Sequence, residues 1–259
     1  MKTKKLCLCL LIFLTSCSII NNKKKSILDE VMDSRKLLIG TTGDYAPFSY
    51  RKKSGESFSG IDIEMAKNLG KSLGVEVEFF HTSWKNLMSD LKEKKFHLAM
   101  SGISKKLSRQ QVALFSKGYI TNGKIAIARC EDKRSFKNLS QIDRKEVRVI
   151  VNPGGTNESF SRQNIKNASL RVFDNNNLIF NEIINNKADV MITDSVEVLY
   201  QSKKHQGKLC AKMKRPLTVG EIGVLIPRDI IWKEYIDSWL HNLEISGEKK
   251  RIFRKYISY

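Results

Sequence analysis

The sequence predicts an α/β fold of two lobes, each a mainly parallel sheet flanked by helices, with a ligand cleft between the lobes. Segments with strand and helix patterns alternate from residue 36 onward, which is typical of parallel α/β sheets. The same alternation restarts near residue 123. The size of the chain also fits, because 259 residues, 41% of them hydrophobic, are enough for one large domain or two smaller ones.

The first unit contains both kinds of segment. Residues 60–74 carry apolar side chains at helical spacing, whereas residues 75–80 alternate and are rich in residues that favour strands. The strands expected in this unit are 36–42, 75–80 and 96–102, and the expected helices are 60–74 and 84–95.

The second unit repeats the pattern, and the end of the chain would return to the first lobe. We therefore expect residues 36–122 together with 217–259 to form lobe 1, and residues 123–216 to form lobe 2. Ligands in such folds lie at the carboxyl ends of strands and at helix N-termini. The further strands expected are 123–130, 147–152, 170–174, 189–194 and 219–226, and the further helices are 136–143, one that begins within 153–166, 177–188, 195–202, 230–245 and 249–257.

Residues 1–16 are typical of an export signal. Three lysines precede an apolar run over residues 6–14, and this run is too short to span a membrane. The letters LTSC that follow resemble a bacterial lipobox and predict that Cys17 is lipidated after cleavage. An ordinary signal peptide with a chance cysteine is the alternative. Residues 17–35 would be a tether and an N-terminal helix, and the protein would be a membrane-tethered lipoprotein of the periplasm.

The cysteines predict one disulfide. Of five cysteines, Cys7 and Cys9 would leave with the signal and Cys17 would carry lipid, so that Cys130 and Cys210 remain. An exported chain meets an oxidising compartment, which favours a Cys130–Cys210 bridge. Two free buried thiols are the alternative.

The chain is basic, with a net charge of +19. The lysines are scattered over expected helix faces without interleaved aromatic residues, so we expect a solvated surface and no nucleic-acid partner. The positive field would still speed the capture of a small anion. The four histidines are dispersed, at positions 81, 97, 205 and 241. We find no spacing typical of metal ligands, so the sequence predicts no metal site.

Polar and aromatic side chains collect at the expected strand ends, and each has an ordinary structural alternative. Asp44 could bond to its own turn, and Trp84 could belong to the core. Thr156 and Asp194 could be helix N-caps. Arg109 would suit a ligand carboxylate, because a guanidinium forms two parallel hydrogen bonds to it. The candidates are Asp44, Tyr45, Phe48, Trp84, Ser101, Ser104, Arg109, Gly155, Thr156, Asp194 and Glu197.

Taken together, these segments resemble the periplasmic amino-acid-binding proteins of ABC transporters. The shared letters are DYAPFSY, GIDIEMA, SGIS, GGTN and TD, spread from about residue 36 to the C-terminus. The resemblance implies the type II fold of periplasmic binding proteins. Within this superfamily the chain is more similar to the cyclohexadienyl dehydratases, through TTGDYAPFSY, TSWKNLM, AMSGIS, IVNPGGTNE, KADVMITDSVE and LIPRD.

Glu197 is the residue that separates the two groups. Three residues after TD the binding proteins usually have an apolar residue, whereas the dehydratases have a glutamate, as this chain does. The resemblance implies that Glu197 is the general acid, with Asp44 and Lys124 as further catalytic residues. It also implies that the substrate is bound by Arg109, Trp84, Phe48, Ser101, Ser104, Asn152, Gly155, Thr156 and Asp194. Ile222 and Val224 depart from the family pattern, which has a lysine and a tyrosine there.

The implied activity is that of a carbon–oxygen lyase without a cofactor. It would convert prephenate to phenylpyruvate and arogenate to phenylalanine by decarboxylative dehydration. The acid would have to be protonated near neutral pH, and burial and neighbouring carboxylates would raise its pKa. The alternative is an amino-acid-binding lipoprotein of an ABC importer, and a permease would be its partner under that interpretation alone.

Overall fold

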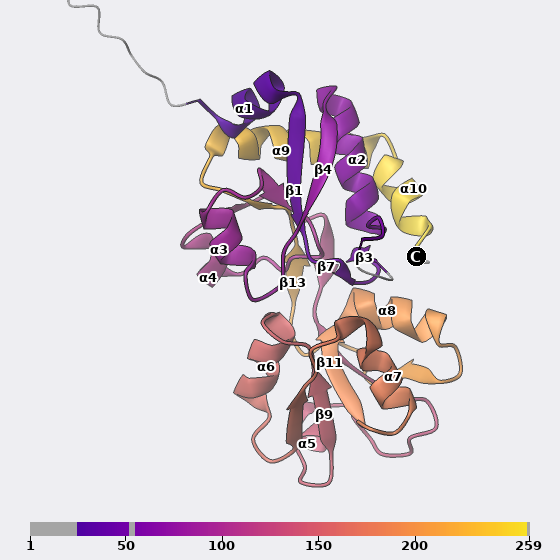
Figure 1. The fold of residues 1–259 in the computed structure, drawn as a ribbon. Helices are drawn as coiled ribbons and strands as arrows, with labels where there is room; N and C mark the ends of the chain where they lie inside the picture. The colour runs from indigo at the N-terminus through magenta and orange to yellow at the C-terminus, as the bar shows by residue number, and fades with distance from the viewer. Residues whose placement is uncertain (1–24, 52–54, 258–259) are drawn as a thin grey trace, which may run out of the picture.

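The fold consists of two lobes, one above the other, joined by a pair of thin crossing strands (Figure 1). The structure is a computed structural model and describes residues 25–51 and 55–257. The predicted two-lobed α/β fold is confirmed. The export signal and Cys17 lie outside the described residues, and their roles stay predictions.

The first lobe is built on a five-stranded sheet in the order β4-β1-β5-β14-β6. A short hairpin, β2 (Asp44–Tyr45) with β3 (Ser49–Tyr50), follows β1 and lies near the second lobe (Figure 1). The strands of the sheet are β1 (Lys36–Thr41), β4 (Glu76–His81), β5 (Leu98–Ala99), β6 (Leu114–Phe115) and β14 (Leu225–Ile226). The helices are α1 (Ile27–Ser34), α2 (Ile61–Leu73), α3 (Leu87–Lys92), α4 (Leu107–Gln110), α9 (Ile230–Ile245) and α10 (Glu248–Arg254).

The second lobe is built on a five-stranded sheet in the order β10-β9-β11-β8-β12. Its strands are β8 (Lys124–Arg129), β9 (Arg148–Val151), β10 (Ser169–Val172), β11 (Val190–Asp194) and β12 (Leu209–Ala211). Its helices are α5 (Leu139–Ile142), α6 (Thr156–Asn164), the 3-10 turn η1 (Asn176–Leu178), α7 (Ile179–Ile184) and α8 (Ser195–Lys204).

Two antiparallel strands, β7 (Ile120–Asn122) and β13 (Gly220–Ile222), connect the lobes. The chain passes from the first lobe to the second through β7 and returns through β13 (Figure 1). The expectation of mainly parallel sheets is wrong in detail, because each sheet has two parallel and two antiparallel pairings. The reason lies in the crossings: β8 and β14 each begin just after the chain has crossed between lobes, so they enter their sheets from the cleft side.

Each lobe has its own apolar core. Helix α2 buries the face that carries Ile63, Ala66 and Leu69, and it ends at Gly74, whose φ of 66° is the left-handed conformation that glycine adopts without strain. The second core is formed by β8, β9, β11 and α7. Val196, at the start of α8, packs instead with the core of the first lobe. The two lobes are therefore in contact through apolar side chains at the N-terminal end of α8.

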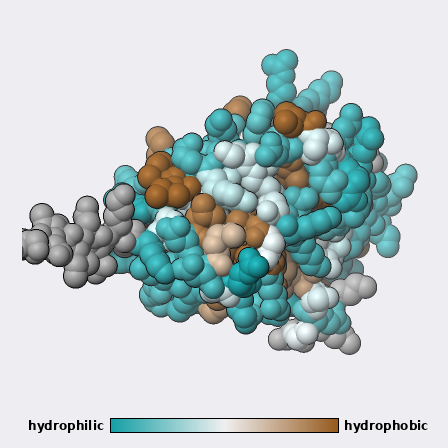
Figure 2. Space-filling view, turned by 90° about the horizontal axis from the view of Figure 1, so that it is seen from above, coloured by the Kyte–Doolittle hydropathy of each residue, from teal (hydrophilic) through white to brown (hydrophobic). Residues whose placement is uncertain are grey.

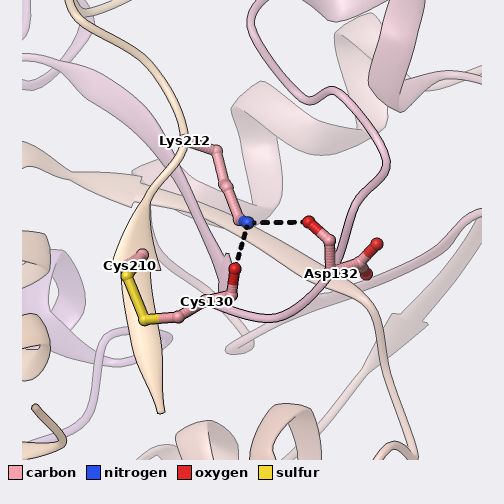
Figure 3. The surroundings of a disulfide bond; sticks show 4 residues. All are labelled: Cys130, Asp132, Cys210 and Lys212. Carbon is pink, nitrogen blue, oxygen red and sulfur yellow. Dashed lines mark hydrogen bonds between the residues drawn. A yellow bond between two sulfur atoms is a disulfide. The ribbon is translucent and has the colours of Figure 1, made fainter. Parts of the chain in front are cut away.

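The predicted disulfide between Cys130 and Cys210 is confirmed (Figure 3). It joins the end of β8 to the edge strand β12. Beside it, the Lys212 ammonium donates hydrogen bonds to the backbone oxygens of Cys130 at 3.4 Å and Asp132 at 3.0 Å. The bridge thus anchors the edge of the second sheet.

The surface is polar over the face of the first lobe seen from above, with apolar residues in small groups (Figure 2). Ile230 and Ile231 are exposed, at 61% and 56%. Within residues 25–51 and 55–257, no helix combines the length and apolar character that crossing a bilayer requires.

Candidate functional site

A small cavity lies between the lobes, and both contribute to its walls. Its volume is about 10 Å³, close to the minimum that holds one water molecule. The first lobe supplies Tyr45, Trp84, Gly102, Ser104 and Arg109, and the second supplies Asn152, Gly155, Thr156, Asn157 and Asp194.

On the side of the second lobe, the cavity residue Asp194 forms a buried ion pair with Lys124, which lies behind the cavity wall. The antiparallel register of β8 and β11 places these two residues opposite each other. The Lys124 Nζ donates to Asp194 Oδ1 at 2.7 Å, and the side chains are only 4% and 6% exposed. Two buried charges persist in such a setting because each is paired and hydrogen-bonded.

Asp194 occupies the N-cap position of α8, yet its side chain makes no capping hydrogen bond. Its second carboxylate oxygen instead accepts a hydrogen bond from the Tyr45 hydroxyl at 2.5 Å. Tyr45 belongs to the first lobe, so this bond crosses the cleft. The alternative that Asp194 is merely a helix cap does not describe its contacts.

Residues at the start of α6 complete the surroundings of Lys124. The Lys124 ammonium donates to Thr156 Oγ1 at 3.0 Å and also to Asn157 Oδ1. The Asn157 amide in turn donates to Asn152 Oδ1 at 3.0 Å and to Thr193 Oγ1 at 2.9 Å. This network leaves the ammonium of Lys124 fully engaged and fixed in direction.

Glu197 is buried one turn into α8, with 1% of its surface exposed. Burial is the main cause that raises its pKa, to about 8, and the Asp194 and Asp44 carboxylates raise it further. A hydrogen bond donated by Thr193 Oγ1 at 2.5 Å and the charge of Lys124 act in the opposite direction. A carboxyl group with this pKa is mostly protonated at neutral pH. Glu197 does not itself line the small cavity and reaches it only by way of these neighbours.

Asp44 and Trp84 form the polar and aromatic rim of the first lobe. The Trp84 indole N–H donates to Asp44 Oδ1 at 3.0 Å. Burial raises the pKa of Asp44 above its usual range, although hydrogen bonds from Thr42 and Trp84 oppose the shift. The Tyr45 ring meets the Trp84 ring edge-on at 5.3 Å between centroids, so the ring of Trp84 is fixed at the cavity wall.

Arg109 lies at the cavity without a carboxylate partner among the residues the structure describes. Its Nη1 donates to the backbone oxygen of Ser104 at 3.0 Å. Burial lowers the pKa of the guanidinium, and the charge of Asp194 partly offsets this. A ligand carboxylate would find an oriented guanidinium at this wall.

Phe48 and Ser101 do not reach the cavity surface. Phe48 is fully buried and stacks on Tyr45 at 5.9 Å between ring centroids. The Ser101 hydroxyl is buried and lies 2.8 Å from the hydroxyl of Thr42. Both support the wall from behind. Ile222 and Val224, where the chain departs from the family pattern, are buried in the first-lobe core and do not line the cavity.

Several residues of the site were not among the sequence-based candidates. Asn157 and Thr193 each lie next to a candidate in the chain, and their contacts depend on strand register. Asp62 accepts hydrogen bonds from the Gly102 backbone N–H at 2.6 Å and from the Tyr119 hydroxyl at 2.7 Å. Burial raises the pKa of Asp62 to about 7. The sequence signal that could have indicated Asp62 is an acidic residue among the apolar residues of GIDIEMA.

Within the described parts of the chain, no cluster of three or more histidine, cysteine, aspartate or glutamate residues could hold a metal ion.

Comparisons with known proteins support the earlier resemblance. The cyclohexadienyl dehydratase of Pseudomonas aeruginosa is 42% identical over 236 residues, which cover 91% of this chain and 88% of the relative. The histidine-binding periplasmic protein of Salmonella typhimurium is 27% identical, with 87% of this chain and 88% of that protein covered.

The solved structures that resemble this chain are of the same two kinds, amino-acid-binding proteins and dehydratases. An ancestral amino-acid-binding protein, described as a precursor of cyclohexadienyl dehydratase, is 31% identical with a TM-score of 0.81 and covers 90% of this chain and 100% of its own. An ancestral cyclohexadienyl dehydratase is 46% identical with a TM-score of 0.56, and the match covers 90% of this chain and 97% of that one. The model of the bacterial extracellular solute-binding proteins, family 3, matches residues 37–259, and the chain belongs to this family.

Proposed function

We propose that this protein is an exported cyclohexadienyl dehydratase that converts prephenate to phenylpyruvate and arogenate to phenylalanine. The relative from Pseudomonas aeruginosa, which has 42% identity, carries the name of this enzyme. The single observation that carries the proposal is Glu197, a buried carboxyl group whose pKa is about 8, beside the Lys124–Asp194 pair.

The proposed reaction requires a proton donor at the step in which the ring hydroxyl leaves. Breaking the bond between the ring and its carboxylate releases carbon dioxide and sends an electron pair through the ring, which becomes aromatic only when the hydroxyl leaves. The bond to the ring hydroxyl then breaks, and this hydroxyl is a poor leaving group unless it is protonated. Glu197 gives that proton, so that water departs and a glutamate anion remains. Lys124 stabilises the anion left on Glu197, since its charge already lowers the pKa of that group.

The remaining site residues bind and orient the substrate. Arg109 would bind a carboxylate through two parallel hydrogen bonds. The N-terminal end of α6, with Gly155 and Thr156, would add backbone donors for an anion. Gly155 lies close to Trp84, since a Cβ placed there would be 3.8 Å from the indole ring. Trp84 would then cover the ring of the substrate, while closure of the lobes excludes water.

The test is the substitution Glu197→Gln, which keeps the shape of the side chain and removes the acid. Purified protein incubated with prephenate should form phenylpyruvate, and the variant should lose at least about 100-fold in kcat, the usual contribution of a general acid. Prephenate binding, measured by calorimetry, should stay within a few-fold of the parent protein. Glu131→Gln is the matched control, because Glu131 is exposed. Full turnover by the Glu197 variant would refute the assignment.

A second function is favoured by a specific observation. Most of the other relatives carry names of amino-acid-binding proteins, and Arg109 with Asp194 forms a pair of opposite charges across the cavity. An amino acid offers a carboxylate and an ammonium group to such a pair. Tight binding of an unmodified amino acid without product formation from prephenate would favour a receptor that delivers its ligand to a permease of an ABC importer.

The proposal includes the location of the protein. Its family is one of extracellular proteins, and the signal over residues 1–16 with Cys17 would tether it to a membrane through lipid on the periplasmic side.

A further inference from the structure

The short turn η1 of the second lobe reaches the hairpin of the first lobe. The Asn176 amide donates from Nδ2 to the backbone oxygen of Asp44 at 2.9 Å. Asn176 precedes α7, whose side chains belong to the core of the second lobe, whereas Tyr45, next to Asp44, belongs to the core of the first. This hydrogen bond therefore exists only while the lobes are closed.

The side chain of Asn176 is buried, and its described hydrogen bonding is limited to Asp44. The residue is 3% exposed, and its Oδ1 is buried without a hydrogen-bond partner among the described residues. Buried amides normally satisfy both ends, because an unpaired polar atom loses its water without replacement. The bond to Asp44 is thus the interaction that orients the side chain. Opening of the lobes would return both ends of the amide to water.

The strand that Asn176 contacts carries one hydrogen bond within the first lobe and one that crosses the cleft. Asp44 accepts the indole hydrogen bond of Trp84, and Tyr45 donates to Asp194. Strand β2 is only two residues long and pairs with β3 alone. A backbone hydrogen bond from the opposite lobe is consequently well placed to fix its position.

We propose that Asn176 is a positioning residue of the closed state. It fixes the main chain of Asp44 against the second lobe, and so brings the Asp44 carboxylate and the Tyr45 hydroxyl into register with Asp194. Closure forms the hydrogen bond of Asn176, which favours the closed state, but it also removes water from Oδ1, which opposes it. Asn176 therefore contributes only a small net free energy to closure. The ligand then decides whether the lobes stay closed. The effect on prephenate kinetics rests on the proposed function, whereas the effect on lobe closure does not.

The sharpest variant is Asn176→Asp, which keeps the size and the acceptor but replaces the donor with a charged oxygen that faces the Asp44 carbonyl. The neighbouring Asn177 is exposed, so Asn177→Asp introduces the same charge one residue away and is the matched control. Lobe closure is measured without ligand, by small-angle X-ray scattering and by the distance between two spin labels, one on each lobe.

We expect the ratio of closed to open protein to fall about tenfold in Asn176→Asp, as for the loss of one good hydrogen bond, and to stay as in the parent in Asn177→Asp. With prephenate, KM should rise about tenfold while kcat changes less, because Glu197 is unchanged once the lobes close. The melting temperature should match that of the Asn177 control.

Closure and KM that match the control would overturn the proposal. A lowered melting temperature with unchanged closure would also overturn it, because Asn176 would then serve only the stability of the second lobe. Failure of the parent protein to form phenylpyruvate would refute the proposed function instead, and the ligand-free closure comparison would still decide the role of Asn176.

Discussion

Glu197 shows how the surroundings of one residue set its chemistry. Its position in the first turn of α8 favours the ionised form, because a helix N-terminus stabilises negative charge. Burial acts in the opposite direction and is the larger effect, so its pKa rises to about 8. The structure thus favours the neutral acid that the proposed elimination needs.

The pH dependence of activity follows from this pKa with a definite sign. An acid donates only when protonated, and Glu197 is protonated below its pKa. We therefore expect kcat/KM for prephenate to fall as the pH rises above about 8, about tenfold per pH unit. The profile is measured by the appearance of phenylpyruvate across this range. A rate that keeps rising above pH 9 would contradict the role of Glu197 as an acid.

The pairing register of single strands positions the charged groups of the candidate site. The pairing of β8 with β11 sets Lys124 against Asp194 at the cleft end of the second sheet. At the other end of β8 the chain reaches Cys130, whose disulfide ties this strand to β12. One strand therefore carries the buried ammonium of the site at its beginning and a covalent anchor at its end.

Removal of the disulfide should lower stability and leave the chemistry intact. The bridge closes a loop with a sequence separation of 80 residues, and loss of such a link costs about 2–5 kcal/mol of unfolding free energy. Cys130→Ser and the double variant with Cys210→Ser should lower the melting temperature equally, since either change removes the same bond. Thermal unfolding and kcat at 20 °C check this. A large loss of kcat in the folded variants would show that the bridge also shapes the site.

At the scale of the whole molecule, the closed cavity is too small for the proposed substrate. A volume of about 10 Å³ accommodates roughly one water molecule, whereas prephenate has a ring and two carboxylates. The lobes must therefore part to admit the substrate and pack around it as they close. Among the described residues, the contacts across the cleft include Tyr45 to Asp194, Asn176 to Asp44, and Val196 against the first core.

Attachment to a membrane is also a property of the whole molecule, and it depends on one cysteine. If Cys17 is lipidated, Cys17→Ser should move the protein from the membrane fraction of cells to the soluble periplasmic fraction, because the acyl anchor on this residue is lost. Cys9→Ser, within the apolar run of the signal, is the matched control and should leave the protein in the membrane fraction. A Cys17 variant that stays with the membrane would show that lipid on this cysteine is not the anchor.

The amino-acid sequence by itself determined the alternation of strands and helices, the two-lobed fold and the identity of the cysteine pair. They follow from local patterns: apolar periodicity, glycines at turns, and the expectation that Cys7 and Cys9 leave with an export signal while Cys17 carries lipid. The sequence also predicted that polar residues such as Asp194 and Thr156 lie at element ends, because that follows from where each element stops.

Only the tertiary structure decided which of those residues meet, and in what state. The contact of Lys124 with Asp194 needs an antiparallel register that alternation alone did not predict, and the bond from Tyr45 needs the lobes to close. Phe48 and Trp84 are equally aromatic in the sequence, yet only Trp84 lines the cavity. The physical reason is that burial, register and closure join residues distant in the chain, and the pKa of Glu197 is set mainly by burial, with smaller effects from neighbours that include Lys124 and Asp44.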